Sequence, residues 1–196
     1  MTILISASKA IALSSAGTSN NPIIGWDNLG YSATATTDVG TEQTEGPAVN
    51  ATTGSTYDAW IAQEDTGEAA LQLAFGSAQS IGFAAIAAHN IGTLGATVEV
   101  QYSTDSGASW TTVASGDTSP ADDQAIAWYF DAVSSDYWRL LVTDLAADDV
   151  VSVGVFFVGN ALTMGQRIYQ GYTPPLTPTE VDLQSNVSEG GHLLGS

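Results

Sequence analysis

Alternating hydrophobic and polar positions mark the middle of the chain as β-structure. Leu71, Leu73 and Phe75 alternate with small or polar residues, which is typical of a half-buried strand. The almost continuous apolar run over residues 81–88 is short enough to be a strand buried on both faces. Residues 97–102 alternate again and predict another amphipathic strand. This succession of short strands, loops and tight turns predicts an all-β protein built as an antiparallel β-sandwich.

Similar patterns on both sides of this region predict about eight to ten strands in total and no helix. Residues 1–13 predict an N-terminal strand, residues 32–47 contain one weak strand, and residues 89–95 form a loop. Further strands are expected near residues 60–63, 126–130, 137–142 and 150–158.

These patterns divide the chain into three segments. Residues 1–19 are an N-terminal strand or arm, and residues 20–163 form the β-sandwich. Residues 164–196 are expected to be an extended C-terminal arm, because Pro174 and Pro175 favour a polyproline-like path and the rest is polar and Gly-containing. Such a segment cannot bury a core of its own, so we expect it to lie against a partner or to stay disordered.

Composition supports one substantial core without covalent cross-links. Hydrophobic residues make up 44% of the 196 residues, with five Trp, seven Tyr and five Phe. The chain has no cysteine, so it is not a small disulfide-stabilised scaffold.

Charge excludes two classes of partner. Lys9, Arg139 and Arg167 are the only basic residues against 21 acidic ones, and the formal net charge is −18. A nucleic-acid groove needs clustered Lys and Arg to neutralise phosphates, and this chain cannot assemble one. Anionic membrane surfaces are disfavoured for the same reason, and no apolar run is long enough for a membrane-spanning helix.

Four residues form a possible ligand rim. His89 and Asn90 end the apolar run, where loops of a β-sandwich often carry ligand contacts. The alternative is that both side chains satisfy backbone groups at the end of the strand. Trp26 and Trp128 are the tryptophans expected to be more exposed, where they could stack against a sugar.

Other prominent side chains are expected to have structural roles. Trp60, Trp110 and Trp138 should pack in the core or at its margin. Arg139 should form an ion pair with an acidic side chain, because an isolated buried charge is costly, and recognition of a ligand carboxylate is the alternative.

Three groups of carboxylates are candidates for a metal-binding or catalytic site. They are Glu64, Asp65 and Glu68; Asp122 and Asp123; and Asp144, Asp148 and Asp149. None has the spacing of a dedicated calcium loop. We therefore expect these carboxylates to be solvated loop charges, with binding of a structural Ca²⁺ as the alternative. No Ser/His/Asp arrangement, zinc spacing or phosphate loop accompanies them. We therefore expect a non-enzymatic protein with no catalytic residue, metal or cofactor.

The order of several sequence elements resembles a known family. These elements are Asn50–Trp60, the strand pair within 71–90, Val98–Trp110, Asp136–Thr143 and the closing strand after residue 150. Over roughly residues 20–163 the chain resembles the discoidin-like, galactose-binding-like family. No single motif is specific, and the order and spacing together carry the resemblance. The resemblance implies a jelly-roll sandwich.

A narrower resemblance is to discoidin-like proteins of tailed bacteriophages. It rests on residues 21–29 (NPIIGWDNL), residues 85–103, the YWRL strand and the ending at residues 190–195. It implies a structural protein located in the virion, in the tail, tail tip or baseplate, which binds other virion proteins and copies of itself. Alternatives are a carbohydrate-binding or host-adhesion module that binds a surface glycan, and a capsid decoration protein.

Overall fold

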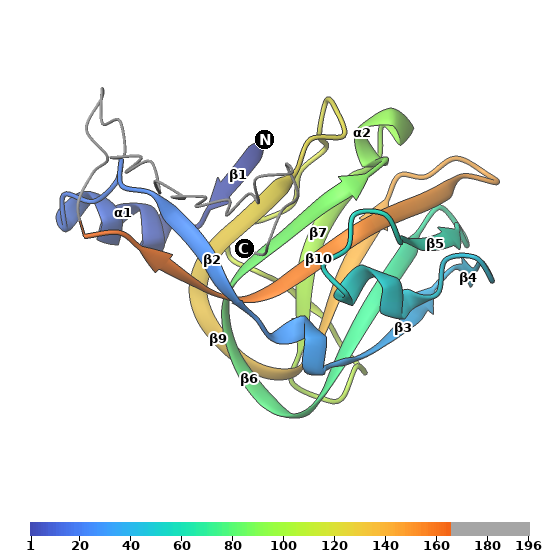
Figure 1. The fold of residues 1–196 in the computed structure, drawn as a ribbon, viewed down its shortest axis with the longest axis horizontal. Coiled ribbons are helices and arrows are strands. Elements are labelled where there is room, and N and C mark those ends of the chain that lie inside the picture. Colours follow the sequence, from blue (N-terminus) through green and yellow to red (C-terminus); the bar gives the residue numbers. More distant parts are fainter. Residues whose placement is uncertain (166–196) are drawn as a thin grey trace, which may run out of the picture.

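The structure is a computed structural model that describes residues 1–165. Ten strands are joined by hydrogen bonds into a network that folds into two layers (Figure 1). In chain order the elements are β1 (Thr2–Ile5), α1 (Ala7–Ser15), β2 (Ile23–Asn28), η1 (Leu29–Ser32), β3 (Thr34–Val39), β4 (Thr41–Glu42), η2 (Ala48–Thr52), β5 (Trp60–Gln63), β6 (Ala69–His89), α2 (Ile91–Leu94), β7 (Thr97–Ser103), β8 (Thr111–Thr112), β9 (Ile126–Thr143) and β10 (Val150–Thr163). The predicted all-β sandwich is confirmed.

The two layers share their longest strands. One layer contains β3, the first half of β6, the second half of β9, β7 and β8. The other contains β4, β5, β10, the second half of β6, the first half of β9 and β1, and β2 pairs with the end of β10. All pairings are antiparallel except that of β1 with β9.

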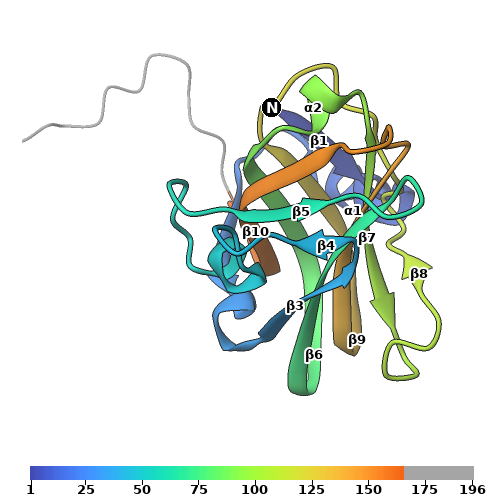
Figure 2. The ribbon, with the colours of Figure 1, turned by 90° about the vertical axis from the view of Figure 1, so that its right-hand side faces the viewer.

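Strands β6 and β9 run side by side through both layers (Figure 2). The sequence pattern indicated two strands in each of these regions, but each is one strand that bends. In β6 the bend follows Phe75, and the register against β9 shifts between Ala74 and Gln79. Residues 76–79 (Gly-Ser-Ala-Gln) carry no large apolar side chain and interrupt the hydrophobic alternation there, so the bend resembles a turn in the sequence.

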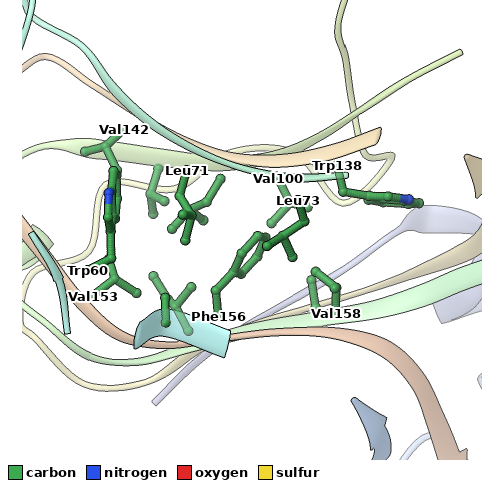
Figure 3. Packing of buried hydrophobic residues seen from close by; sticks show 14 of the residues in the cluster. Trp60, Leu71, Leu73, Val100, Trp138, Val142, Val153, Phe156 and Val158 are labelled. Atoms are coloured by element: carbon green, nitrogen blue, oxygen red, sulfur yellow. The ribbon is translucent and has the colours of Figure 1, made fainter. Parts of the chain in front are cut away.

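The core lies between the layers (Figure 3). Leu71 and Leu73 of β6 face Phe156 of β10, and all three are fully buried. Trp60 and Trp138 are also fully buried, as predicted. The indole N–H of Trp60 donates to the Thr37 hydroxyl at 2.8 Å, so this polar group is satisfied inside the core.

The N-terminal region contains a helix that the sequence pattern missed. Residues 2–5 form the expected strand, but α1 begins at Ala7, so the strand prediction for residues 7–13 is wrong. The Ser6 hydroxyl accepts from the Lys9 N–H and caps the helix, and the alanine-rich composition favours helix. The helix buries only Leu13, which explains its weak hydrophobic periodicity.

The predicted C-terminal arm lies outside the described residues from residue 166 onward. Among the helices of residues 1–165, none has the length and apolar character needed to cross a membrane.

Candidate functional site

Loops that connect the two layers meet at one end of the sandwich. Strand β5 ends there and β6 begins, and β9 ends there and β10 begins, so the loops 64–68 and 144–149 are neighbours. The loop before β9 reaches the same end. We call the carboxylates of these loops the acidic rim: Glu64, Asp65, Glu68, Asp117, Asp122, Asp123, Asp144, Asp148 and Asp149. The three acidic groups noted in the sequence therefore gather at one end.

Direct hydrogen bonds hold the two neighbouring loops together. The Glu64 carboxylate accepts from the Gly67 N–H at 2.8 Å and from the Asp148 N–H at 3.1 Å. The Glu64 N–H donates to the Asp149 carbonyl at 2.9 Å, and the Leu145 N–H donates to the Gly67 carbonyl. Glu64 is thus a structural carboxylate, whereas Asp65, Glu68 and Asp148 are exposed.

His89 lies under the rim with both ring nitrogens engaged. Its Nε2 donates to the Gln124 carbonyl at 3.0 Å, and Nδ1 accepts from the Ile91 N–H at 3.3 Å. The residue is 6% exposed, and burial lowers the pKa of the imidazole below its ordinary value. This geometry fits the structural alternative given above, and no ring nitrogen is left to face a ligand.

The Asn90 side chain also forms hydrogen bonds to backbone groups. Its amide donates to the Val150 carbonyl at 2.8 Å, and its side-chain oxygen accepts from the Ser152 N–H at 2.8 Å. These two bonds fix the end of β6 against the beginning of β10. Asn90 therefore positions the rim.

A similar contact ties α2 to the loop before β9. The Asp123 carboxylate accepts from the hydroxyl of Thr93 at 2.6 Å and from its N–H at 2.9 Å. The hydroxyl bond is the main cause that lowers the pKa of Asp123, so this carboxyl stays ionised.

The rim lacks basic side chains within the described part of the chain. Lys9 lies 3.8 Å from Asp131, and Arg139 lies 2.8 Å from Asp38, so both basic side chains of residues 1–165 are paired elsewhere. The expected ion pair of Arg139 is confirmed, and its guanidinium also stacks on Trp110, 4.4 Å from the ring centroid.

The rim carboxylates are spread along the edge of the molecule. Among the described residues, no three or more Asp, Glu, His or Cys side chains gather closely enough to hold a metal ion. The structure therefore offers the calcium alternative no set of ligands within residues 1–165.

The two tryptophans of the predicted ligand rim, Trp26 and Trp128, have opposite environments. Trp26 on β2 is 65% exposed, as predicted. The prediction for Trp128 is wrong: it is fully buried, and its indole N–H donates to the Gly116 carbonyl at 3.1 Å. Trp128 alternates with Ile126 and Phe130, which are also buried, so it faces the core with them. Trp26 lies on β2, away from the acidic rim, so the four residues of the predicted ligand rim do not form one site.

An open hollow of about 300 Å³ lies between β3, β4 and η2, and no motif in the sequence predicted it. It is lined by Ala35, Thr36, Thr37, Glu42, Pro47, Ala48 and Val49. One Glu42 oxygen accepts from the Thr37 hydroxyl and the Ala48 N–H, both at 2.9 Å. The hollow is formed within one stretch of the chain, residues 35–49, by the way β3, β4 and η2 fold against one another.

Comparison with known proteins identifies one matching family model, the F5/8 type C domain, over residues 32–152. This span runs from the residues before β3 to the beginning of β10 and includes all loops of the acidic rim. No protein with curated annotation matches the chain significantly.

Solved structures agree with this family. Chitosan-binding module 1 of a chitosanase/glucanase from Paenibacillus sp. IK-5 is 25% identical, with a TM-score of 0.58 over 69% of this chain and 100% of the module. Module 2 of the same enzyme, in complex with chitotriose, is 22% identical (TM-score 0.56, 68% and 100% covered). A Clostridium perfringens module in complex with GalNAc-β-1,3-galactose is 14% identical (TM-score 0.56, 68% and 100% covered). The last two establish a shared fold.

Proposed function

The chain belongs to the F5/8 type C domain family, and from this membership we propose that it is a non-catalytic carbohydrate-binding module. The observation that carries the proposal is the likeness to the chitosan-binding module, which this chain covers over the full length of that module. The carbohydrate-binding alternative stated from the sequence thus becomes the leading function.

The acidic rim supports a positively charged glycan as the ligand. Chitosan is rich in glucosamine, whose amino group is cationic when protonated. A surface that gathers carboxylates without basic residues raises the local concentration of cations. Exposed carboxylates such as those of Asp65, Glu68 and Asp148 can accept charge-assisted hydrogen bonds from ammonium groups and bonds from sugar hydroxyls.

The rim has the rigidity that a binding surface needs. The contacts of Glu64, Asn90 and Asp123 fix the loops to one another, while other rim carboxylates remain free at the surface. Such a surface binds without large loop rearrangement, which lowers the entropic cost of association.

Calorimetric titration with chitosan oligosaccharides tests the proposal. We expect binding below the pKa of the sugar amine, weaker binding above it, and further weakening as added salt screens the rim. Fully N-acetylated oligosaccharides of the same length, which are neutral, are the matched control ligand and should bind less. Equal binding of both ligands would contradict the cationic preference, and absence of binding to any glycan would contradict the module function.

Neutralising the rim locates the site. The double variant Asp65→Asn, Glu68→Gln should weaken binding about 1.4- to fivefold for each carboxylate, because exposed charge pairs contribute about 0.2–1 kcal/mol. Asp136→Asn removes one carboxylate at the bend of β9, remote from the rim, and is the control for each single replacement. Equal effects for each charge removed would mean that net charge alone, and no site at the rim, explains binding.

The virion role remains a prediction from the sequence resemblance. Nothing in the comparisons links the chain to bacteriophage tail proteins. A tail or baseplate protein, a capsid decoration protein and a location in the virion are therefore hypotheses for the context in which the module would work. Detection of the chain in purified particles by mass spectrometry would support them.

A further inference from the structure

Strand β1 leaves one edge of the second layer open. It pairs with β9 alone, with Thr2 opposite Ile126 and Ile5 opposite Tyr129 (Figure 1). Within residues 1–165, no strand pairs with its other edge. This region lies outside the span that matches the family model.

The hydrogen bonds to β9 show which backbone groups face the open edge. The Thr2 N–H donates to the Ala125 carbonyl at 3.1 Å, and the Ser6 N–H donates to the Tyr129 carbonyl at 2.9 Å. In a parallel pair every second residue directs its N–H and C=O to the neighbour, so Leu4 faces β9 as well. The N–H and C=O groups of Ile3 and Ile5 therefore point outward from the sheet.

Apart from its length of only four residues, this edge lacks the features that usually prevent strand pairing. Edge strands are commonly protected by charged residues, proline or a bulge, and residues 2–5 contain none of these. Two large apolar side chains are exposed instead, Ile3 at 55% and Ile5 at 39%. The edge is thus a suitable template for another strand.

The distribution of charge favours a second copy of the chain as that strand's source. All 21 acidic residues follow Trp26, so residues 1–26 contain no carboxylate side chain and a single charged one, Lys9. Lys9 lies 4.9 Å from the ring centroid of Tyr129 and 3.8 Å from Asp131, whose charge it offsets. Two copies of an acidic protein repel one another least where the approaching segments carry no negative charge.

We propose that two copies associate through antiparallel pairing of β1 around a twofold axis at Leu4. Ile3 of one copy then lies opposite Ile5 of the other. Because both residues direct their backbone groups to the open edge, each such pair exchanges two hydrogen bonds. The Ile3 and Ile5 side chains of both copies gather on one face, and the second layer continues across the dimer. This association does not depend on the glycan-binding function.

Analytical ultracentrifugation of the full chain tests the proposal. The molar mass should rise from 20.2 kDa toward about twice that value with increasing protein concentration. Added salt should favour the dimer, because it screens repulsion between the two acidic copies. A monomer at all concentrations and salt levels would overturn the proposal.

A charge-matched pair of variants identifies the surface. Ile3→Lys places a cation on the open edge, whereas Ile24→Lys makes the same change at an isoleucine of β2 that is similarly exposed, at 48%. We expect Ile3→Lys to raise the dissociation constant at least about tenfold and Ile24→Lys to change it less than about twofold. Equal effects would overturn the assignment to β1.

Ile5→Pro tests the backbone pairing itself. It removes an N–H that faces outward in the monomer, so the bonds to β9 remain and the fold should tolerate it. The variant should be monomeric with a thermal midpoint close to that of the wild type. A folded Ile5→Pro protein that dimerises like the wild type would rule out pairing through β1, and Ile3→Lys decides the question if Ile5→Pro does not fold.

Discussion

His89 links three chain segments below the rim through its two ring nitrogens. The carbonyl that accepts from Nε2 belongs to Gln124, and the N–H that donates to Nδ1 belongs to Ile91. The sequence placed His89 at a strand end, where both a ligand role and a structural role were reasonable. It could not decide between them, because the position of Gln124 depends on a loop that returns from a distant part of the chain.

Protonation of His89 should destabilise the protein. The added proton would sit on Nδ1 and oppose the Ile91 N–H, and burial already lowers the pKa of the ring. A histidine with a lowered pKa contributes its stability above its ordinary pKa of about 6.5 and loses it as the pH falls. Urea unfolding should therefore show a falling free energy of unfolding from about pH 7 to about pH 5. His89→Gln should reduce this slope, and an NMR titration that gave a raised pKa would contradict the prediction.

The tryptophans show how far residue patterns determine burial. Trp138 and Trp60 were correctly assigned to the core, whereas Trp128 was expected at the surface. The alternation of Trp128 with Ile126 and Phe130 contained the right signal, because residues two apart on a strand share a face. The size and amphipathic character of the tryptophan side chain, taken alone, predicted the wrong environment for Trp128.

Trp138→Ala should cost about 3–5 kcal/mol of the free energy of unfolding. The side chain is fully buried, its ring centroid lies 6.1 Å from that of Phe130, and its indole N–H donates to the Ser135 carbonyl at 3.1 Å. Chemical denaturation measures the loss, with the exposed Trp26→Ala as a control that should stay within about 0.5 kcal/mol. A cost below about 1 kcal/mol for Trp138→Ala would mean that the core packs differently.

At the scale of elements, the positions of the long strands were predictable and their continuity was not. Local alternation identified both halves of β6 and both halves of β9. Whether a polar interruption is a turn or a bend depends on how the two layers pack, and that information is not local. The helix α1 was missed for a related reason, since one buried residue, Leu13, gives too weak a periodicity to compete with the isoleucines around it.

The short helix α2 packs tightly against the loop before β9, and Gly92→Ala tests that contact. A Cβ at Gly92 would collide with the backbone of Asp122, which the Thr93–Asp123 bonds hold in place. Overpacking of this kind should cost about 1–3 kcal/mol in thermal or chemical unfolding. Gly76→Ala is the matched control, since a Cβ there meets nothing within 4 Å, and it should be close to neutral. Equal stabilities of the two variants would show that the loop can move away.

At the scale of the whole molecule, the fold determines what the acidic residues do together. The sequence presented three separate groups of carboxylates with calcium, catalysis and simple solvation as alternatives. Connections between the layers bring all three groups to one end, away from Lys9 and Arg139. Composition alone predicts the size of the net charge, but only the topology shows that the carboxylates gather at the acidic rim, the proposed glycan-binding surface. The uneven distribution of acidic residues along the chain also leaves β1 without carboxylates.

This charge distribution predicts how salt and calcium affect stability. Mutual repulsion among carboxylates opposes the compact state of a chain with a net charge of −18, and salt screens that repulsion within about 10 Å at 0.1 M. The thermal midpoint should therefore rise with NaCl, and less so in the Asp65→Asn, Glu68→Gln variant. Because residues 1–165 contain no group of carboxylates suited to a metal ion, CaCl₂ at equal ionic strength should give a similar rise, and EDTA should not lower the midpoint. Saturable stabilisation by calcium at constant ionic strength would instead reveal a specific ion site and restore the structural calcium alternative.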